Sequence, residues 1–137
     1  MISYNYRYPL TAVNEKELSN WIRMVIDCEE HELGELSFTF VDDGALHEMN
    51  VEYLGHNSLT DVISFDYTVG KVVQGDVFIS VDRVKDNARE FGVNFNNELS
   101  RVMIHGVLHY CGYKDKTDSD KLVMRGKEDF YLNMLFK

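Results

Sequence analysis

The chain carries the stretch His105-Gly106-Val107-Leu108-His109-Tyr110-Cys111-Gly112-Tyr113-Lys114-Asp115. Its two histidines stand four residues apart, and on a helix such residues lie on one face, one turn from each other. Gly112 is the expected end of that helix, because glycine accepts the left-handed conformation that commonly terminates helices. The chain can then fold back and present Asp115 as a third ligand. Three protein ligands with one open position are typical of a catalytic zinc site, whereas structural zinc sites have four.

The histidine pair alone does not require a metal, because pairs at this spacing often lie on a helix surface or in a core. The glycine and the carboxylate in register, H-x3-H-x2-G-x2-D, favour the metal site. Cys111 is a rival ligand, but at about 100° per residue it points well away from the histidine face. We expect it to be a small buried hydrophobic residue. Asp118 and Asp120 are alternative carboxylates, which we expect to cap the final helix.

Length and composition indicate one globular domain over residues 1–137. The chain has 137 residues and 45% hydrophobic content, enough for a sizeable core. No apolar run approaches the roughly 20 residues that cross a bilayer. The first residues lack the basic and apolar segments of a signal peptide. Cys28 and Cys111 do not make a disulfide framework. We therefore expect a cytoplasmic protein without a membrane partner.

The net charge of −9 is unfavourable for a nucleic-acid partner, since phosphate binding normally needs basic side chains. By itself this acidity favours another class of ligand. A local positive groove or a bound divalent metal can still provide the necessary charge.

Hydrophobic periodicity, turn residues and capping residues predict alternating helices and strands. The helices are expected to run from Asn14 to about Cys28, from Asp42 or Asp43 through Tyr53, from Ser80 to Gly92, from about Asn96 to Cys111, and onward from Asp118 or Ser119. The strands are expected at 36–40, Thr60–Phe65 and Gly75–Ser80. Val84, Ala88 and Phe91 are expected to point inward, and Leu122, Val123, Phe130 and Met134 lie along the last helix. This order predicts an α+β fold, in which a small mixed β-sheet is packed with helices and one helix bears H-x-x-x-H-x-x-G-x-x-D. The acidic run at 27–32 is expected to be a solvated helix end.

A zinc ion held by His105, His109 and Asp115 would lower the pKa of a bound water toward neutrality. It would thereby supply hydroxide for attack on an ester, an amide or a phosphodiester. The spacing is shared in outline with metalloproteases of the H-E-x-x-H-x-x-G-x-x-H type. Those enzymes need a glutamate directly after the first histidine as general base. Here that position is Gly106, so peptide hydrolysis by that mechanism lacks its base.

Three blocks of sequence resemble the YbeY endoribonucleases, also called rRNA maturation factors. The family signature H-G-x-L-H-L-x-G-Y-D-H is similar to H-G-V-L-H-Y-C-G-Y-K-D here. The block L-N-x-x-Y-R-x-K-D-x-x-T-D-V-L-S-F is similar to 49–65, and the strand G-D-I-x-I-S with its following helix is similar to Gly75–Ser80 and Asn87–Glu90. The blocks occur in the same order over roughly residues 36 to 135.

This resemblance implies a bacterial, metal-dependent endoribonuclease that is specific for single-stranded RNA. It implies a role in maturation of small-subunit ribosomal RNA and in ribosome quality control. The implied partners are single-stranded RNA, ribosomal RNA and the small ribosomal subunit, with no DNA expected. The implied cofactor is one Zn²⁺ ion, with another divalent metal as the alternative. By position, the metal ligands and catalytic residues are His105, His109 and Asp115.

Two departures from the family pattern concern the site. The family's third ligand is usually histidine, and here it is Asp115. The arginine of the second block, which is thought to help bind RNA phosphate, is replaced by Leu54, and leucine cannot donate a hydrogen bond. Four basic residues are candidate replacements: Arg83, Arg89, Lys114 and Lys116.

Thr60, Asp61 and Ser64 form a polar group at the start of a predicted strand. The resemblance favours a role in lining the cleft and binding substrate, although Thr, Asp and Ser at such a position are also common in simple turns. Two other functions are retained as alternatives. One is a zinc hydrolase of another class, such as a peptidase, and the other is a ribosome-associated protein in which the metal is structural.

Overall fold

The computed structural model describes residues 1–10, 13–55 and 60–136, and for Leu54 only the backbone. The strands are β1 (Ile2–Tyr6), β2 (Glu32–Val41), β3 (Val62–Asp66) and β4 (Val72–Ser80). The helices are α1 (Glu15–Cys28), α2 (Asp43–Leu54), α3 (Val81–Phe91), α4 (Phe95–Tyr110) and α5 (Asp118–Leu135). The side chain of Leu54, and with it the predicted loss of a phosphate contact, lies outside the described residues.

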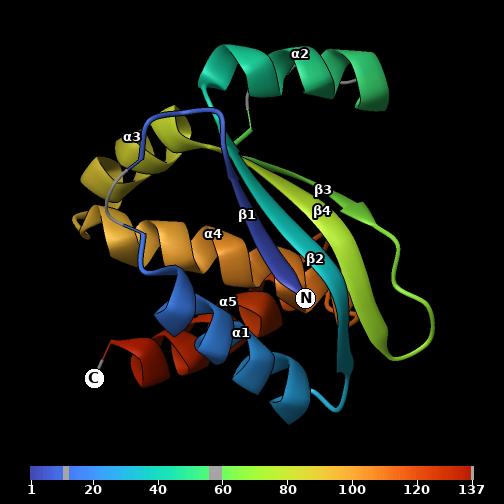
Figure 1. Ribbon diagram of the computed structural model, residues 1–137. Helices are drawn as coiled ribbons and strands as arrows, with labels where there is room; N and C mark the ends of the chain where they lie inside the picture. Colours follow the sequence, from blue (N-terminus) through green and yellow to red (C-terminus); the bar gives the residue numbers. More distant parts are fainter. Residues whose placement is uncertain (11–12, 56–59, 137) are drawn as a thin grey trace.

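The strands form one mixed sheet in the order β1-β2-β4-β3. β1, β2 and β4 are parallel, and β3 pairs antiparallel with β4. Helices α1, α4 and α5 lie on one side of the sheet and α2 lies alone on the other, with α3 beside α4 (Figure 1). The predicted α+β class with a mixed sheet is confirmed. The predicted order omitted β1, because an edge strand has one neighbour and its pairing with β2 is non-local.

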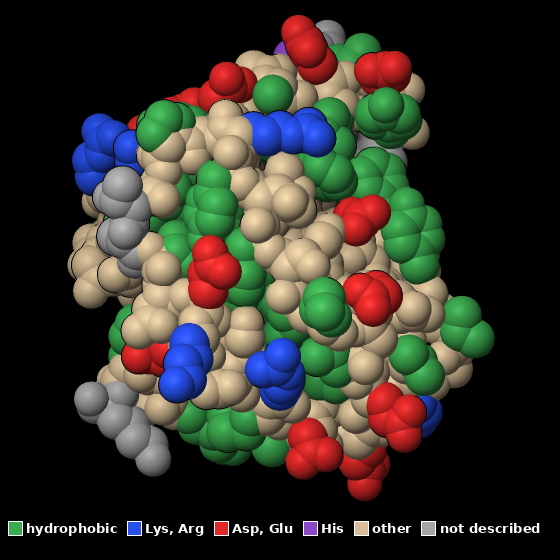
Figure 2. Space-filling view, in the orientation of Figure 1, with side chains coloured by type: hydrophobic (Ala, Val, Ile, Leu, Met, Phe, Trp, Pro, Cys, Tyr) green, Lys and Arg blue, Asp and Glu red, His purple; other side chains and the backbone are tan. Residues whose placement is uncertain are grey.

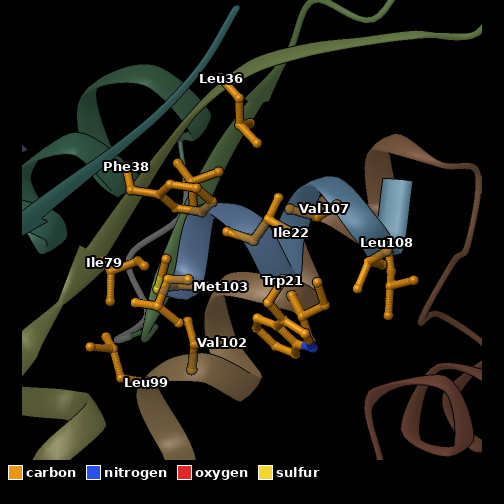
Figure 3. Close-up of a cluster of buried hydrophobic side chains, with 14 of the residues drawn as sticks. Trp21, Ile22, Leu36, Phe38, Ile79, Leu99, Val102, Met103, Val107 and Leu108 are labelled. Atoms are coloured by element: carbon orange, nitrogen blue, oxygen red, sulfur yellow. The ribbon is translucent and has the colours of Figure 1, made fainter. Parts of the chain in front are cut away.

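The main hydrophobic core lies between the sheet and the helices α1, α4 and α5. Alternate residues of β2 and β4 point into it, because successive side chains of a strand face opposite sides of the sheet. Figure 3 shows this packing around Phe38, Trp21 and Met103. A smaller cluster of Val41, Leu46 and Ile63 lies under α2 on the other face.

Helix α4 is the central helix of this core. Its first turn is capped by Asn94, whose side chain accepts a hydrogen bond from the backbone N–H of Asn97 at 2.7 Å. At its other end, the Tyr110 hydroxyl donates to the backbone carbonyls of Phe65 at 3.1 Å and Asp76 at 3.3 Å. Gly75 makes room for that hydroxyl, since a Cβ there would lie 2.6 Å from it. These contacts fix the last turn of α4 against the sheet.

Two expectations about single residues, Phe91 and Asp118, were wrong. Phe91 does not point inward, because its side chain is 56% exposed at the end of α3. Leu122, Val123 and Phe130 lie on α5 as predicted and are exposed, whereas Met124, Tyr131 and Leu132 of this helix face the core. The helix begins at Asp118, as predicted, but its N-cap is Thr117 rather than Asp118, and Thr117 forms a capping box with Asp120. Among the helices of the described residues, none is long and apolar enough to cross a membrane.

Candidate metal centre

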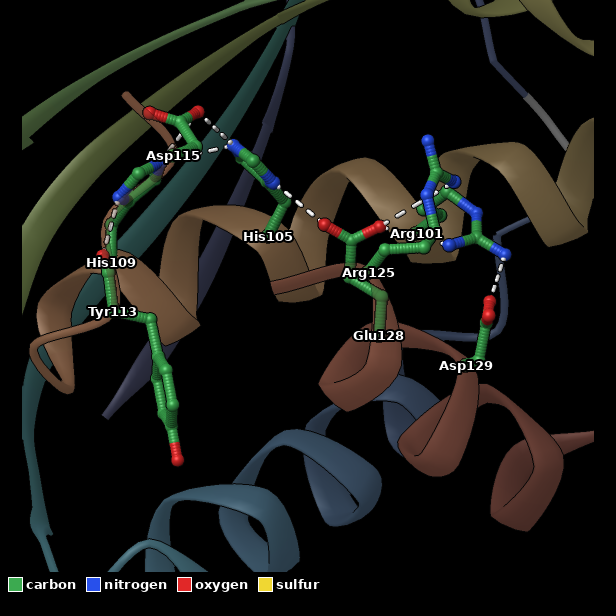
Figure 4. Close-up of polar contacts among 8 residues, drawn as sticks. All are labelled: Arg101, His105, His109, Tyr113, Asp115, Arg125, Glu128 and Asp129. Carbon is green, nitrogen blue, oxygen red and sulfur yellow. Dashed lines mark hydrogen bonds and ion pairs between the residues drawn. The ribbon is translucent and has the colours of Figure 1, made fainter. Parts of the chain in front are cut away.

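The three predicted ligands come together at the end of α4. The Nε2 atoms of His105 and His109 lie 3.0 Å apart. Oδ2 of Asp115 lies 3.2 Å from the first and 3.3 Å from the second. Asp115 reaches this position because the chain turns back at Gly112, whose φ of +103° is in the region that favours glycine. Figure 4 shows the carboxylate above the two imidazoles.

Each imidazole is held through its other nitrogen. Nδ1 of His109 lies 2.8 Å from the backbone carbonyl of Tyr113, and Nδ1 of His105 lies 2.7 Å from Oε2 of Glu128. A carbonyl and a carboxylate can only accept, so each Nδ1 carries the hydrogen. Each neutral imidazole then has its lone pair on Nε2. This is the arrangement in which histidines ligate metals, with the second nitrogen bonded to an oxygen.

The three converging atoms are therefore all acceptors. Two lone pairs and a carboxylate oxygen repel one another unless a cation or a proton lies between them. Ligand atoms that lie 2.0–2.1 Å from a tetrahedral zinc ion are about 3.3 Å from one another. The observed separations of 3.0–3.3 Å fit that requirement. The same three residues are the group in the described part of the chain whose ligand atoms could hold one metal ion.

Negative charge surrounds His105. Burial alone would lower its pKa, but the hydrogen bond and charge of Glu128, followed by the charges of Asp115 and Asp61, raise the pKa overall. Burial likewise tends to raise the pKa of Glu128, but its bonds with His105 and Arg101 outweigh this and lower it. Surroundings that favour a proton on this imidazole also favour a metal cation in its place.

Glu128 belongs to an ion-pair network that sequence reasoning missed. Oε1 of its 5% exposed side chain accepts from Arg101 at 2.8 Å, and Arg101 also binds Asp129 at 2.7 Å. Figure 4 shows the Glu128 carboxylate between His105 and Arg101. A signal was present in the sequence, because Met124, Glu128 and Tyr131 share the i, i+4, i+7 stripe that faces the core.

A second carboxylate, Glu29, supports the turn that follows α4. It accepts hydrogen bonds from the hydroxyl of Tyr113 at 2.6 Å, from Lys127 at 3.1 Å and from Tyr131. Burial tends to raise its pKa, but these bonds outweigh that effect and lower it. The prediction that this acidic run is a solvated helix end is thus wrong for Glu29, whose side chain is 9% exposed. Its partners lie 84 to 102 residues away in sequence.

Cys111 is not part of the cluster. Its side chain is half-buried and packs against the main core. Burial, followed by the charge of Glu29, raises the pKa of its thiol to about 12. A thiol must lose its proton to ligate a metal, so this finding agrees with the expected hydrophobic role.

A pocket of about 390 Å³ opens beside the candidate ligands. Its walls come from α3, α4, α5 and the start of β3, and include Asp61, Asn87, Glu98, Arg101, His105, Asp115, Lys121, Arg125 and Glu128. Of the three predicted substrate residues, Asp61 lines the pocket and Thr60 and Ser64 do not. Thr60 donates its hydroxyl to the Val62 carbonyl at 3.2 Å, as in a simple turn. Ser64 lies in β3 opposite Val77.

Two carboxyl groups in this pocket have altered acidity. Burial raises the pKa of Asp61, whose Oδ2 accepts from Asn87 at 3.4 Å. Burial also raises the pKa of Glu98, which is only 3% exposed. Sequence reasoning missed Glu98, although it stands in the apolar stripe of α4 with Leu99 and Val102.

Gly106 packs on the sheet. A Cβ at this position would lie 3.5 Å from the side chain of Val77 in β4. The helix position that carries the general base in H-E-x-x-H proteins is therefore directed at the core here.

The fold and the site define a small α+β protein with a three-ligand candidate metal centre beside a pocket. The model of the family described as endoribonuclease YbeY matches residues 4–136. The chain belongs to this YbeY family. It is 54% identical over 129 residues to the endoribonuclease YbeY of Flavobacterium johnsoniae, covering 94% of this chain and 93% of that protein. It is 52% identical to that of Flavobacterium psychrophilum, covering 98% and 96%.

A solved structure is also similar. The solution structure of TM1509 from Thermotoga maritima superposes with a TM-score of 0.70 and 26% sequence identity. The match covers 99% of this chain and 89% of that one. The resemblance inferred from three sequence blocks is thus confirmed over a longer part of the chain.

Proposed function

We propose that this protein is a metal-dependent endoribonuclease that cuts single-stranded RNA. We further propose that it acts in the cytoplasm on ribosomal RNA of the small subunit, in maturation and quality control. The observation that carries the proposal is the convergence of three acceptor atoms, two Nε2 and one Oδ2, within 3.3 Å of one another. The endoribonuclease names of relatives up to 54% identical supply the class of substrate.

In this proposal His105, His109 and Asp115 hold one zinc ion. When bound, zinc supplies a nucleophilic water at neutral pH and polarises a phosphoryl oxygen. Glu128 and the Tyr113 carbonyl keep the Nδ1 hydrogens in place, so that both Nε2 atoms remain available.

The three residues of the predicted substrate group have separate roles in this proposal. Asp61 lines the pocket and its pKa is raised by burial, so we propose that it donates a proton during RNA cleavage. Thr60 and Ser64 are neighbours of Asp61 in sequence, and we propose that they contact RNA beyond the pocket.

The test is an RNA cleavage assay on the purified protein before and after chelation. We expect a labelled single strand to be cut, the same strand in a duplex to persist, and zinc to restore activity after chelation. His109→Ala, purified in parallel, controls for contaminating nuclease and should leave the strand intact. An intact single strand at high enzyme and zinc concentrations would rule the proposal out.

Two further assays separate the alternatives. Casein digestion would indicate a peptidase, against which the buried position of Gly106 argues. Co-sedimentation with ribosomal particles that persists in folded His105→Ala, together with no cleavage by the wild type, would indicate a structural metal.

A further inference from the structure

Helix α5 directs two basic side chains at the pocket beside the metal centre. Lys121 and Arg125 stand one turn apart, and residues at this spacing share a face of a helix. Met124 and Glu128 of the same helix line the same pocket. The wall that α5 forms therefore extends from Glu128, which supports His105, to Arg125 and Lys121.

The ion pairs of this wall leave Arg125 without a counter-charge of its own. The single carboxylate of Glu128 serves His105 at 2.7 Å and Arg101 at 2.8 Å, whereas Arg125 approaches it only to 3.7 Å. Arg101 is 18% exposed and has Asp129 as a second partner, but the Arg125 side chain is 56% exposed. Lys121 forms no ion pair with any residue in the described ranges.

These two cations, neither of which has a close carboxylate partner among the described residues, suit a phosphate group. A guanidinium binds two phosphate oxygens at once through parallel N–H bonds, and an ammonium adds a point charge. Asp61 and Glu98 line the same pocket, and burial raises the pKa of both carboxyl groups.

One face of the molecule can be compared with this wall of the pocket. The chain has 23 acidic and 14 basic residues. On the face drawn in Figure 2, Lys and Arg side chains are scattered among acidic ones and form no continuous patch over the coloured residues. The four basic residues expected from the sequence to replace the arginine of the second block, Arg83, Arg89, Lys114 and Lys116, do not line the pocket.

We propose that Arg125, assisted by Lys121, forms a phosphate subsite for a phosphodiester that neighbours the one at the metal centre. The inference rests on the proposed function, because it takes the ligand to be a single-stranded nucleic-acid backbone. In the family pattern, an arginine of the second sequence block is thought to bind RNA phosphate, and this chain has Leu54 there. The proposal gives that phosphate contact to α5.

The test is equilibrium binding of a short fluorescent single strand with 2′-O-methyl sugars, whose integrity is checked on a gel afterwards. Arg125→Gln should weaken binding about tenfold and lower the slope of log affinity against log salt by about one. Lys121→Gln should have a smaller effect, and Arg125→Lys should restore part of the affinity. Arg23→Gln removes one exposed charge from α1, away from the pocket, and should match the wild type in both quantities.

Equal binding by wild type and Arg125→Gln would overturn the subsite, as would equal losses in Arg125→Gln and Arg23→Gln. A wild type that does not bind the strand would overturn it as well. RNA cleavage measured on the same preparations separates the two proposals. Selective loss of binding in Arg125→Gln, with no RNA cleavage by the wild type, would keep the subsite and reject the nuclease.

Discussion

The two histidines of the candidate metal centre are supported in different ways. His105 is held by a side chain, the Glu128 carboxylate, which reaches α4 from α5. His109 is held by the main chain, through the carbonyl of Tyr113. The first support brings a negative charge and depends on one residue. The second is neutral, and no side-chain substitution removes it directly.

The difference extends to what lies behind each support. Glu128 is fixed by Arg101, which Asp129 holds in turn. The carbonyl of Tyr113 is fixed because the side chain of the same residue bonds to Glu29, at the end of α1. We infer that the His105 half of the site is sensitive to single substitutions and that the His109 half depends on the turn as a whole.

Removing the carboxylate support should have the largest effect. Glu128→Ala leaves Arg101 with Asp129 alone and leaves Nδ1 of His105 without its hydrogen-bond partner. We expect a loss of about 3 kcal/mol in the free energy of unfolding, measured by urea denaturation, because one partner of a buried ion pair is lost. Competitive zinc titration should show a 10- to 100-fold loss of affinity.

Asp129→Asn is the matched control, because it removes the charge of the exposed partner of Arg101 without touching His105. It should cost no more than about 1 kcal/mol and leave zinc affinity unchanged. Equal zinc affinity in Glu128→Ala and wild type would show that His105 needs no such support.

Asp115 lies almost equally far from both imidazoles, so its replacement affects both halves. A carboxylate donates more negative charge to a metal than imidazole and makes it a weaker Lewis acid. We expect Asp115→His to bind zinc more tightly or to shift the pH profile of RNA cleavage to lower pH. No change in either quantity would count against Asp115 as a ligand.

Tyr113→Phe tests the main-chain support. It removes the hydroxyl that donates to Glu29 but keeps the carbonyl that holds His109. We expect a loss of about 1.5 kcal/mol in stability, as for a hydrogen bond to a charged group, and only a few-fold loss of zinc affinity. Tyr67→Phe is the control, because it removes the hydroxyl of a tyrosine that is 58% exposed and lies outside the site, and it should change neither stability nor zinc affinity. An affinity loss as large as that of Glu128→Ala would contradict the proposed difference.

The smallest expected effect is a pH dependence of stability from Glu29. Hydrogen bonds lower its folded-state pKa below the ordinary 4.5, so its stabilising contribution is complete above pH 4.5. The contribution is lost as pH falls through the folded-state value. The difference in unfolding free energy between wild type and Glu29→Gln, measured on metal-free protein, should therefore shrink below pH 4.5. A difference that grows on acidification would have the wrong sign.

Local patterns in the sequence were sufficient for most elements of the fold. Capping residues such as Asn14 and Ser80 mark helix starts, and the spacing of His105 and His109 places both on one face of α4. Strand β1 was missed, because a short edge strand depends on a partner far along the chain.

The supports of the site could not be predicted in the same way. Glu29 looks like any acid at a helix end until Tyr113 and Lys127 are brought to it by packing. Glu128 stands in an apolar stripe, and a charged residue at such a position predicts a buried partner. The stripe does not predict which histidine Glu128 contacts. The spacing of the ligands is local, whereas the carboxylates that support the site, Glu128 and Glu29, come from distant parts of the chain.

The most direct test is the zinc content of wild type and Asp115→Ala, measured by elemental mass spectrometry on preparations that are also assayed for RNA cleavage. We predict about one zinc ion per wild-type chain, as three ligands and one open position require. We predict less zinc and weaker cleavage in Asp115→Ala. RNA cleavage by metal-free wild type, or full metal content and full cleavage in the variant, would contradict the proposed metal centre.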